Sequence, residues 1–314
     1  MRAIIAIIIM LFLLTSCNVD MSGYAITDAD IAEKAEQKTT PKETAPVMPE
    51  EPIKLCPQNI TIASFNIKDF SDKTRTDEEL LMITEVLANF DLITVQEVTG
   101  DPIILNRTID MLNSKTGKHY HFEVSKPLGN VQKERYAFIY NTDKVWLEEG
   151  PDVYIDASNK FIREPYIAEF RSFNFDFVIV TVHIKYGEGP ADRAVEMKEI
   201  ANVYNYLQSK DAHENDIILT GDFNTQPWED NFKYIKEEIK DSWYAISKGK
   251  TTIGDSGHLY DNIIFTKKAT QEYTGAKGIY MFDEILGLTQ EEAREKVSDH
   301  RPVYAIFCTG TDDD

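Results

Sequence analysis

The chain has 314 residues, of which 42% are hydrophobic and 11% aromatic, and this composition excludes a wholly disordered protein. Its 53 acidic and 33 basic side chains give a net charge of −20, which argues against broad non-specific attraction to nucleic acid, because polyanion-binding proteins are usually basic. A local site in which a metal ion supplies the positive charge remains compatible with this balance.

The first 16 residues have the pattern of an export signal peptide. Arg2 precedes an apolar run over residues 3–14, and small residues then lead to Cys17. The run is shorter than the roughly 20 apolar residues that a membrane-spanning helix needs. A cysteine at the cleavage point resembles the bacterial lipoprotein box, which implies cleavage before Cys17 and acylation of its thiol and new amino group. We therefore expect a lipoprotein of the cell envelope, anchored in a membrane and facing the periplasm or the cell surface. The alternative is an ordinary signal peptide followed by an incidental cysteine.

The rest of the chain divides by composition into three parts. Residues 17–53 are rich in charge and proline and hold little that could pack, so they are expected to form a flexible tether. Residues 311–314 are expected to form a solvated acidic tail. The folded catalytic domain is expected to cover residues 54–310.

Hydrophobic spacing within residues 54–310 predicts strands that alternate with helices. A capping box of Thr76 and Glu79 is expected to begin the first helix. The mixture of elements indicates an α/β protein with layered helices and sheets, although the pattern alone does not define the topology. Further helices are expected near 104–112, 191–207 and 229–240, and strands near 60–67, 92–95, 120–124, 136–140, 145–147, 167–170, 173–184, 217–219, 262–265 and 302–307.

Two further cysteines lie at opposite ends of the expected domain. Cys56 precedes its first strand and Cys308 follows its last. If these strands pair antiparallel with Asn66 near His300, the two thiols fall close together. Export to an oxidising compartment would permit a disulfide between them; the alternative is two unpaired thiols.

The stretch D-I-I-L-T-G-D-F-N at 216–224 reads as a buried strand that ends in polar residues. Gly221 ends the apolar run, and Asp222 and Asn224 follow with one residue between them. Alternate residues that leave a strand point the same way, so the two side chains are expected to emerge together. Such a pair can orient a water molecule or a metal ion, but a polar strand exit without function is an equal alternative.

Polar side chains recur at other strand ends, and their combination favours a site. Singly, each has an ordinary explanation: a histidine that closes a strand is more often a hydrogen-bonded core residue, and carboxylates are common at sheet edges. The residues of this set are Asn66, Glu97, Glu134, His183, Asp222, Asn224, Asp261, Asp299 and His300.

The phrases around these residues occur in a characteristic order along the chain. They are S-F-N-I at 64–67, Q-E-V at 96–98, K-E-R-Y at 133–136, R-E-P at 163–165, V-H at 182–183, G-D-F-N at 221–224, Y-D at 260–261 and S-D-H-R-P at 298–302. Together they resemble the endonuclease/exonuclease/phosphatase superfamily. K-E-R-Y, R-E-P and S-K-P-L-G at 125–129 are narrower and resemble its deoxyribonuclease I-like nucleases. The resemblance implies a four-layer α/β/β/α sandwich of two packed mixed sheets, with the site at one end.

The resemblance also implies a metal site. Glu97 would be the principal ligand of Mg²⁺, with Asn66 beside it and Asp299 completing the cluster. A lone glutamate with an amide suits the preference of Mg²⁺ for oxygen and for few protein carboxylates. Mn²⁺ is a second candidate ion.

The same resemblance makes His183 and His300 an acid–base pair on opposite sides of the phosphate. Histidine can do both jobs near neutral pH. Glu134 would orient His183, and Asp261 would orient His300. We assign His300 as the base and His183 as the acid, with the reverse left open.

Four further positions receive roles by resemblance. Asp222 and Asn224 would place the water, the metal or the phosphate. Arg163, a bidentate donor, would contact a phosphate oxygen, with a surface salt bridge as its alternative. Lys68 lies where the family places a base that contacts phosphate.

Two departures from deoxyribonuclease I weaken the case for tight binding of duplex DNA. Thr99 stands where that enzyme has an arginine, and the segment 129–132 lacks the arginine and tyrosine that enter the minor groove. The loop at 254–257 looks too short for the structural Ca²⁺ site, so structural Ca²⁺ is not expected. Single-stranded DNA and RNA therefore stay open as substrates.

Three functions compete at this stage. The first is a metal-dependent DNA endonuclease tethered to the cell envelope, bound to the membrane through Cys17 and to its nucleic acid substrate, with no obligate protein partner evident. The second is a phosphodiesterase or phosphatase that acts on a lipid or inositol headgroup. The third is a catalytically silent binding module, which would require the loss of a catalytic group, and each expected group is present.

Overall fold

Two six-stranded mixed sheets form the framework of the protein in the computed structural model, which describes residues 52–130, 133–210 and 215–310. These residues belong to one of the two compact units of the chain, Ala45–Asp314. The first sheet has the order β11 (Tyr273–Ile279), β12 (Val303–Cys308), β1 (Asn59–Phe70), β2 (Leu92–Thr99), β4 (Glu134–Asn141), β3 (Tyr120–Val124). The second has the order β5 (Trp146–Val153), β6 (Tyr166–Ser172), β7 (Phe175–His183), β8 (Ile217–Asp222), β10 (Asp261–Thr266), β9 (Ser242–Tyr244).

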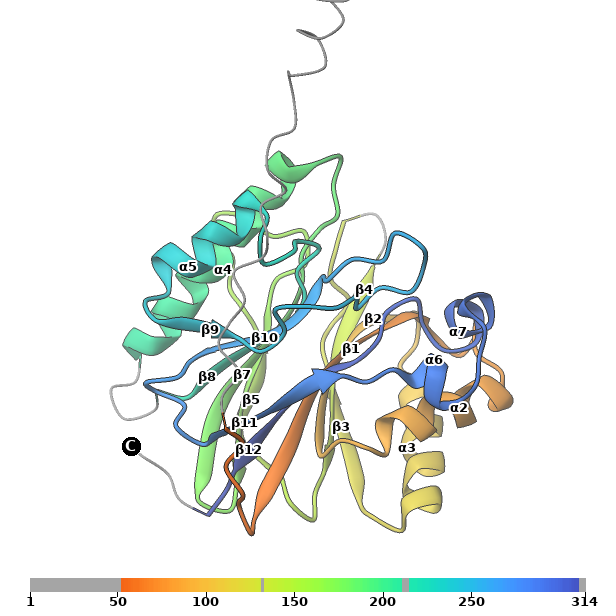
Figure 1. The fold of residues 1–314 in the computed structure, drawn as a ribbon. Helices are drawn as coiled ribbons and strands as arrows, with labels where there is room; N and C mark the ends of the chain where they lie inside the picture. The colour runs from red at the N-terminus through yellow and green to blue at the C-terminus, as the bar shows by residue number, and fades with distance from the viewer. Residues whose placement is uncertain (1–51, 131–132, 211–214, 311–314) are drawn as a thin grey trace, which may run out of the picture. The chain divides into compact units, whose positions relative to one another are not determined.

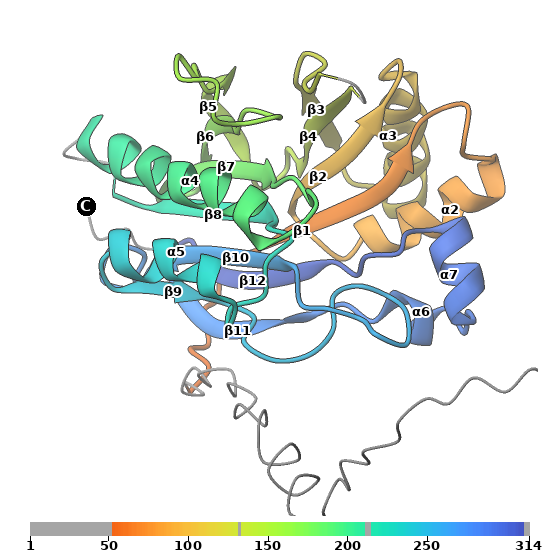
Figure 2. The same cartoon turned by 90° about the horizontal axis from the view of Figure 1, so that it is seen from above.

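Helices cover the outer face of each sheet (Figures 1 and 2). The second sheet carries α4 (Pro190–Lys210) and α5 (Lys233–Glu238), which share a buried apolar cluster with β7 and β8. The first sheet carries α2 (Asp77–Leu87), α3 (Ile103–Thr116), α6 (Phe282–Ile285) and α7 (Gln290–Lys296). The predicted four-layer α/β/β/α sandwich is therefore confirmed.

The alternation of apolar side chains along the strands explains why both faces of each sheet are buried. In β1, Ile60 and Ile62 pack between the two sheets, whereas Ala63 and Phe65 pack against the helices. Side chains of a strand point alternately to the two faces, so a strand that is apolar throughout needs a layer on each side. The sandwich supplies both layers.

Most of the predicted elements are present, and the capping box of Thr76 and Glu79 is confirmed at the start of α2. The helix expected near 229–240 is instead a 3₁₀ turn, η1 (Asp230–Phe232), followed by the short helix α5. Four elements were not predicted: β9, β11, α6 and α7. The sequence did carry a mark of α7, since Thr289 and Glu292 form a second capping box at its start.

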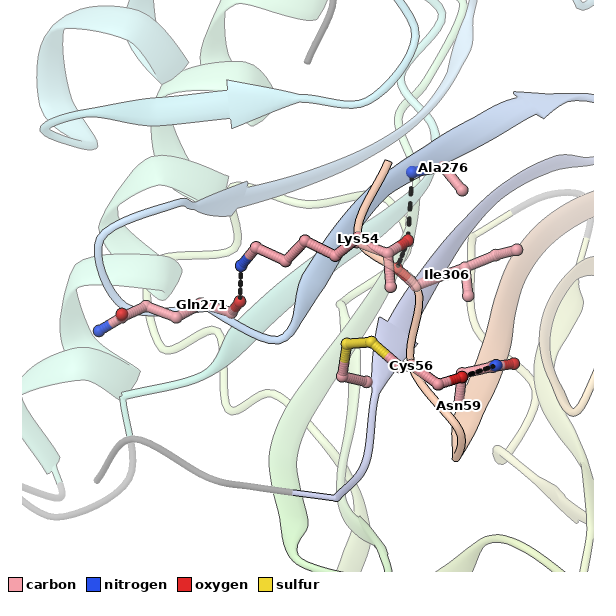
Figure 3. Close-up of a disulfide and its surroundings, with 8 residues drawn as sticks. Lys54, Cys56, Asn59, Gln271, Ala276 and Ile306 are labelled. Atoms are coloured by element: carbon pink, nitrogen blue, oxygen red, sulfur yellow. Dashed lines mark hydrogen bonds between the residues drawn. A yellow bond between two sulfur atoms is a disulfide. The ribbon is translucent and has the colours of Figure 1, made fainter. Parts of the chain in front are cut away.

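A disulfide joins Cys56 to Cys308, with the two Cα atoms 5.6 Å apart (Figure 3). β1 and β12 pair antiparallel, and Asn59 lies opposite Cys308 in their register. This pairing brings the two ends of the domain together as predicted. Nearby, Asn59 donates a hydrogen bond to the carbonyl of Cys56, and Lys54 donates one to the carbonyl of Gln271.

The predicted boundaries of the leader, the tether and the tail lie almost wholly outside the described residues, so they stay predictions. Cys17 also lies outside them. None of the helices in the described part of the chain combines the length and the apolar character needed to cross a membrane.

Candidate active site

The candidate site lies where strands of both sheets end. β1 and β2 run parallel in the first sheet, and β7 and β8 run parallel in the second. Parallel neighbours finish at the same edge, so Asn66 lies opposite Gln96, and His183 lies opposite Asp222. β10 begins at the same edge of the second sheet, with Asp261 opposite Asp222. The Asn66 amide donates to the Asp222 carboxylate at 3.2 Å, which places both strand ends in one site.

Gly221 is required for the close approach of β7 and β8 at this edge. Its φ is +139°, and a Cβ there would lie 2.0 Å from the carbonyl oxygen of Val182. Any side chain would push β8 away from β7 and would separate His183 from Asp222. The strand therefore continues through Gly221 to Asp222 and does not end at the glycine as predicted, and Gly221 has a structural role beside the site.

A shift in strand register turns Glu97 toward the site. The pairing of β2 with β4 shifts between Val95 and Val98, and Glu97 has a left-handed φ of 64°. Such irregularities re-aim side chains next to functional sites. Asn66 donates to one carboxylate oxygen of Glu97 at 3.0 Å, and the backbone N–H of Asp69 donates to the other at 3.1 Å.

His183 is held by Glu134, as the sequence analysis expected. The ring Nδ1 lies 2.9 Å from Oε2 of Glu134, and the Arg163 guanidinium lies 2.7 Å from Oε1. Burial and the charge of Arg163 oppose protonation of the ring, but Glu134 more than offsets them, so the pKa of His183 lies above its usual value. Burial likewise works against ionisation of Glu134, yet its two cationic partners hold the pKa of this carboxyl below its usual value.

His300 forms the matching pair with Asp261. The distance from its Nδ1 to Oδ2 of Asp261 is 2.8 Å. Burial lowers the pKa of His300, but the charges of Asp261 and Asp222 and the hydrogen bond raise it to about 10. A raised pKa favours the protonated form of this ring.

One carboxylate oxygen of Asp222 connects the two pairs. It lies 3.6 Å from Nε2 of His183 and 3.7 Å from Nε2 of His300. The Nε2 atoms of both rings therefore lie close to the same carboxylate oxygen. This convergence is what an acid–base pair around a phosphate requires.

The donor atoms around Glu97 fit a hard divalent cation. Asn66 is fully buried, and its Oδ1 has no hydrogen-bond partner among the described residues. A free amide oxygen beside a carboxylate is the ligand set that Mg²⁺ prefers. Glu97 and Asn66 would hold the ion. A second cluster, Asp222, Asp261 and His300, has its ligand atoms within 4.8 Å of one another. It is less suited to Mg²⁺, because the hydrogen bond between His300 and Asp261 engages two of its members.

Asp299 and Lys68 lie together at the edge of the site, with Nζ of Lys68 3.9 Å from the carboxylate. The next residue along the chain, Asp69, donates its backbone N–H to Glu97 at 3.1 Å. Asp299 and Glu97 therefore both lie near the end of β1. Its metal contact and the phosphate contact of Lys68 stay predictions.

Arg163 is placed differently from the expected phosphate donor. It is largely buried and binds Glu134, and its Nε and Nη2 donate to the carbonyl of His183 at 3.1 and 3.0 Å. A guanidinium committed to the backbone and to the partner of His183 favours a positioning role. Direct contact of Arg163 with substrate stays a prediction.

Asn224 lies beside Asp222, but for a reason other than strand alternation. β8 ends at Asp222, and Asn224 has a left-handed φ of 46°. Its backbone N–H donates to Oδ1 of Asp222 at 2.8 Å, and its side-chain amide donates to the carbonyl of Ile184 at 2.8 Å. A turn therefore brings the two residues together.

Two site residues received no role in the sequence analysis. The hydroxyl of Ser298 donates to the carbonyl of Asn66 at 2.7 Å and accepts from the N–H of His300 at 3.0 Å. Ser298 therefore links β1, which carries Asn66, to the backbone of His300. The hydroxyl of Tyr136 accepts from the N–H of His183 at 2.9 Å. Ser298 belongs to the motif S-D-H and Tyr136 to the motif K-E-R-Y. A sequence motif does not predict which backbone group a hydroxyl will bind.

Comparison with known proteins gives the family. Residues 63–300 match the model of the Endonuclease/Exonuclease/phosphatase family. The chain is 32% identical over 263 residues to a deoxyribonuclease of Thioalkalivibrio sp. (strain K90mix), covering 79% of this chain and 71% of that protein. It is 29% identical to deoxyribonuclease-1 of Bos taurus, covering 78% of this chain and 91% of the relative.

Solved structures share the fold at low sequence identity. The human Nocturnin catalytic domain with bound sulfate anion has a TM-score of 0.56 at 18% identity and covers 81% of this chain and 96% of that domain. Truncated Caenorhabditis elegans TDP2 has a TM-score of 0.56 at 13% identity, with coverage of 80% and 97%. These two likenesses concern the fold alone.

Proposed function

The chain belongs to the endonuclease/exonuclease/phosphatase family, and from this premise we propose that it is a divalent-metal-dependent endonuclease that cleaves DNA. The observation that carries the proposal is the convergence of both histidine Nε2 atoms on one oxygen of Asp222, at 3.6 and 3.7 Å. The names of the deoxyribonuclease relatives support the choice of DNA. The oxygen ligands at Glu97 and Asn66 support the metal requirement.

Each group around the phosphate then has one task. Mg²⁺ held by Glu97 and Asn66 would stabilise the charge that develops on the phosphate oxygens. His300 takes a proton from the attacking water at its Nε2, and Asp222 orients that water. His183 gives the proton at its Nε2 to the departing oxygen. Asp261 and Glu134 fix the rings through Nδ1, so both Nε2 atoms face the phosphate.

For His300 to act as a base, its pKa must fall when substrate and cation bind. Burial already lowers the pKa, and the charges of Asp261, Asp222 and Asp299 are the causes that raise it. A cation held by Glu97 and Asn66 would lie close to Asp222, because the Asn66 amide donates to both carboxylates, and its positive charge would lower the pKa of His300.

The test measures which substrates the purified protein hydrolyses. Plasmid DNA, RNA and sphingomyelin are incubated with the protein in Mg²⁺ and then in EDTA. Nicking of the plasmid that stops in EDTA supports the proposal. Release of a lipid headgroup without cleavage of nucleic acid contradicts it.

Substitution of either histidine separates catalysis from folding. His183→Ala and His300→Ala are each expected to lower the rate of DNA hydrolysis by about 10²–10⁴-fold, the usual contribution of an acid or base. Circular dichroism should show an unchanged fold, and Tyr206→Ala, on the exposed side of α4, provides a control. Wild-type activity in either histidine variant would overturn the assignment.

We also propose that the enzyme is tethered to the cell envelope through a lipid on Cys17. The lipoprotein-like pattern of residues 1–17 supports this location. Cys17→Ala is expected to release soluble protein from the membrane fraction. A variant that remains bound to the membrane would exclude the anchor.

A further inference from the structure

A pocket of about 600 Å³ opens beside the acid–base pair described above, with His300 in its wall. Its walls are the loop 252–258, Arg294 on α7, Tyr186 after β7, and the edge formed by Asp299 and His300. This volume lies within the range of roughly 300–1,000 Å³ that is typical of small-ligand sites. A group in the pocket would therefore lie next to the phosphate that His300 acts upon.

Aromatic rings give this pocket flat apolar surfaces. The ring of His258 stacks on the ring of Tyr260, with centroids 4.8 Å apart and planes only 6° from parallel. Tyr186 is 62% exposed, and the guanidinium of Arg193 lies over its ring, 5.5 Å from the centroid. Tyr186 and His258 both line the pocket, so its wall holds two aromatic side chains.

The polar groups of the pocket suit the edge of a planar base better than a phosphate. Arg294 is exposed and has no ion pair or hydrogen bond with any residue of the described ranges. Asp255 also lines the pocket and is exposed, so its carboxylate would repel a phosphate. A guanidinium and a carboxylate together offer donors and acceptors to the hydrogen-bonding edge of a base.

The net charge of the chain also favours recognition of a base over attraction to the phosphate backbone. A net charge of −20 gives little general attraction to a duplex backbone. Stacking of bases on aromatic rings does not depend on net charge and accepts any base. In a duplex, the base next to the cleaved phosphate would first have to leave the stack, at a cost that an unpaired strand does not pay.

We propose that this pocket receives one unpaired nucleobase next to the phosphate being cleaved, so that the enzyme prefers single-stranded over double-stranded nucleic acid. The inference rests on the proposed nuclease function and specifies its substrate class. Tyr186 and His258 provide the stacking surfaces, and Arg294 provides hydrogen bonds to the base.

The experiment uses oligonucleotides with a single cleavable phosphodiester, the other linkages being methylphosphonates. Each is prepared as a single strand, as a duplex, and as single strands with an abasic residue on one or the other side of that phosphate. The full-length protein is compared with Tyr186→Ala, Tyr186→Phe and Arg294→Ala, and kcat/KM is measured in Mg²⁺. Tyr206→Ala is the control, because Tyr206 is an exposed tyrosine of α4 that does not line the pocket.

The losses caused by a pocket variant and by an abasic residue are expected to be non-additive. The wild-type enzyme should cleave the single strand at least about tenfold faster than the duplex, and one of the two abasic residues should cost about tenfold. Tyr186→Ala and Arg294→Ala should each lose about tenfold on the intact strand and lose little more on that abasic strand. Tyr186→Phe keeps the ring and should retain most of the activity, and Tyr206→Ala should match the wild type.

Three results would overturn the inference, and they distinguish failure of the base pocket from failure of the proposed function. Equal cleavage of duplex and single strand, or equal losses of the variants on intact and abasic strands, would refute the base pocket while leaving the nuclease in place. Absence of cleavage of any nucleic acid would refute the proposed function itself, and the pocket assignment with it.

Discussion

Replacing Glu134 with glutamine tests the role of the His183 pair most directly. The two carboxylate oxygens of Glu134 face two donors, Nη1 of Arg163 at 2.7 Å and Nδ1 of His183 at 2.9 Å. Glutamine has one oxygen and one NH₂ group, so it can satisfy only one of them as an acceptor. The guanidinium is always a donor and should take the oxygen. The NH₂ group then faces Nδ1, which must lose its proton.

The magnitude follows from the protonation state of the ring. In the wild type Glu134 raises the pKa of His183, which favours the protonated ring. This imidazolium is the form that can donate a proton from Nε2. With an NH₂ group against Nδ1, the neutral ring keeps its only proton on Nε2 and is a far weaker acid. General acid catalysis contributes about 10²–10⁴-fold, or about 3–5 kcal/mol of activation free energy, and most of it should be lost. The free energy of unfolding should fall by about 1–3 kcal/mol, because Arg163 stays buried with a weaker partner.

The assay compares two leaving groups. Hydrolysis of an oligonucleotide needs a proton on the departing oxygen, whereas a nitrophenyl ester of a nucleotide has a leaving group that departs without one. Glu134→Gln should lose at least about 10²-fold on the oligonucleotide and much less on the nitrophenyl ester. Glu149→Gln, an exposed glutamate in β5, is the control. Equal losses on both substrates would refute the acid role of His183 and would favour the reversed assignment of the two histidines.

Three other predictions concern metal, pH and the disulfide. Glu97→Gln should raise the Mg²⁺ concentration for half-maximal activity by at least about tenfold, measured by metal titration, and an unchanged requirement would exclude Glu97 as a ligand. Arg301 donates to both oxygens of Asp283, at 2.9 and 2.6 Å, and burial opposes but does not prevent a lowered pKa of this carboxyl. The pair should therefore stabilise the fold above the unfolded pKa of about 3.9 and lose this effect as the pH falls through the lower folded pKa. Urea unfolding of Asp283→Asn should show a shallower pH dependence in that acidic window, and identical slopes would contradict the argument. Because the bond between Cys56 and Cys308 closes a loop with a sequence separation of 252, a double serine variant should lose about 2–5 kcal/mol of unfolding free energy, and an unshifted urea midpoint would refute this.

The sequence motifs named the residues of the candidate site and its two histidine–carboxylate pairs, but they did not reveal the other contacts. Glu134 and His183 are 49 positions apart, and His300 and Asp261 are 39 apart, yet each pair forms a short hydrogen bond. Both pairs could be named because their residues stand in sequence motifs of the family. These motifs did not reveal that Arg163 forms an ion pair with Glu134 and donates to the carbonyl of His183. A guanidinium binds the acceptors that the tertiary structure brings close to it. Asn224 illustrates the same limit, because a left-handed turn replaced the expected strand alternation.

The sequence by itself indicated layered helices and sheets and, through the family motifs, the candidate catalytic and metal-binding residues. Apolar side chains that alternate along β1 require cover on both faces, and carboxylates and histidines at strand ends provide groups for proton transfer and metal binding. Only the tertiary structure decided where these groups meet. The convergence on Asp222 depends on Gly221, on the shifted register of β2 and on the packing of two sheets against each other. These are consequences of contacts between distant segments, which local residue preferences do not encode.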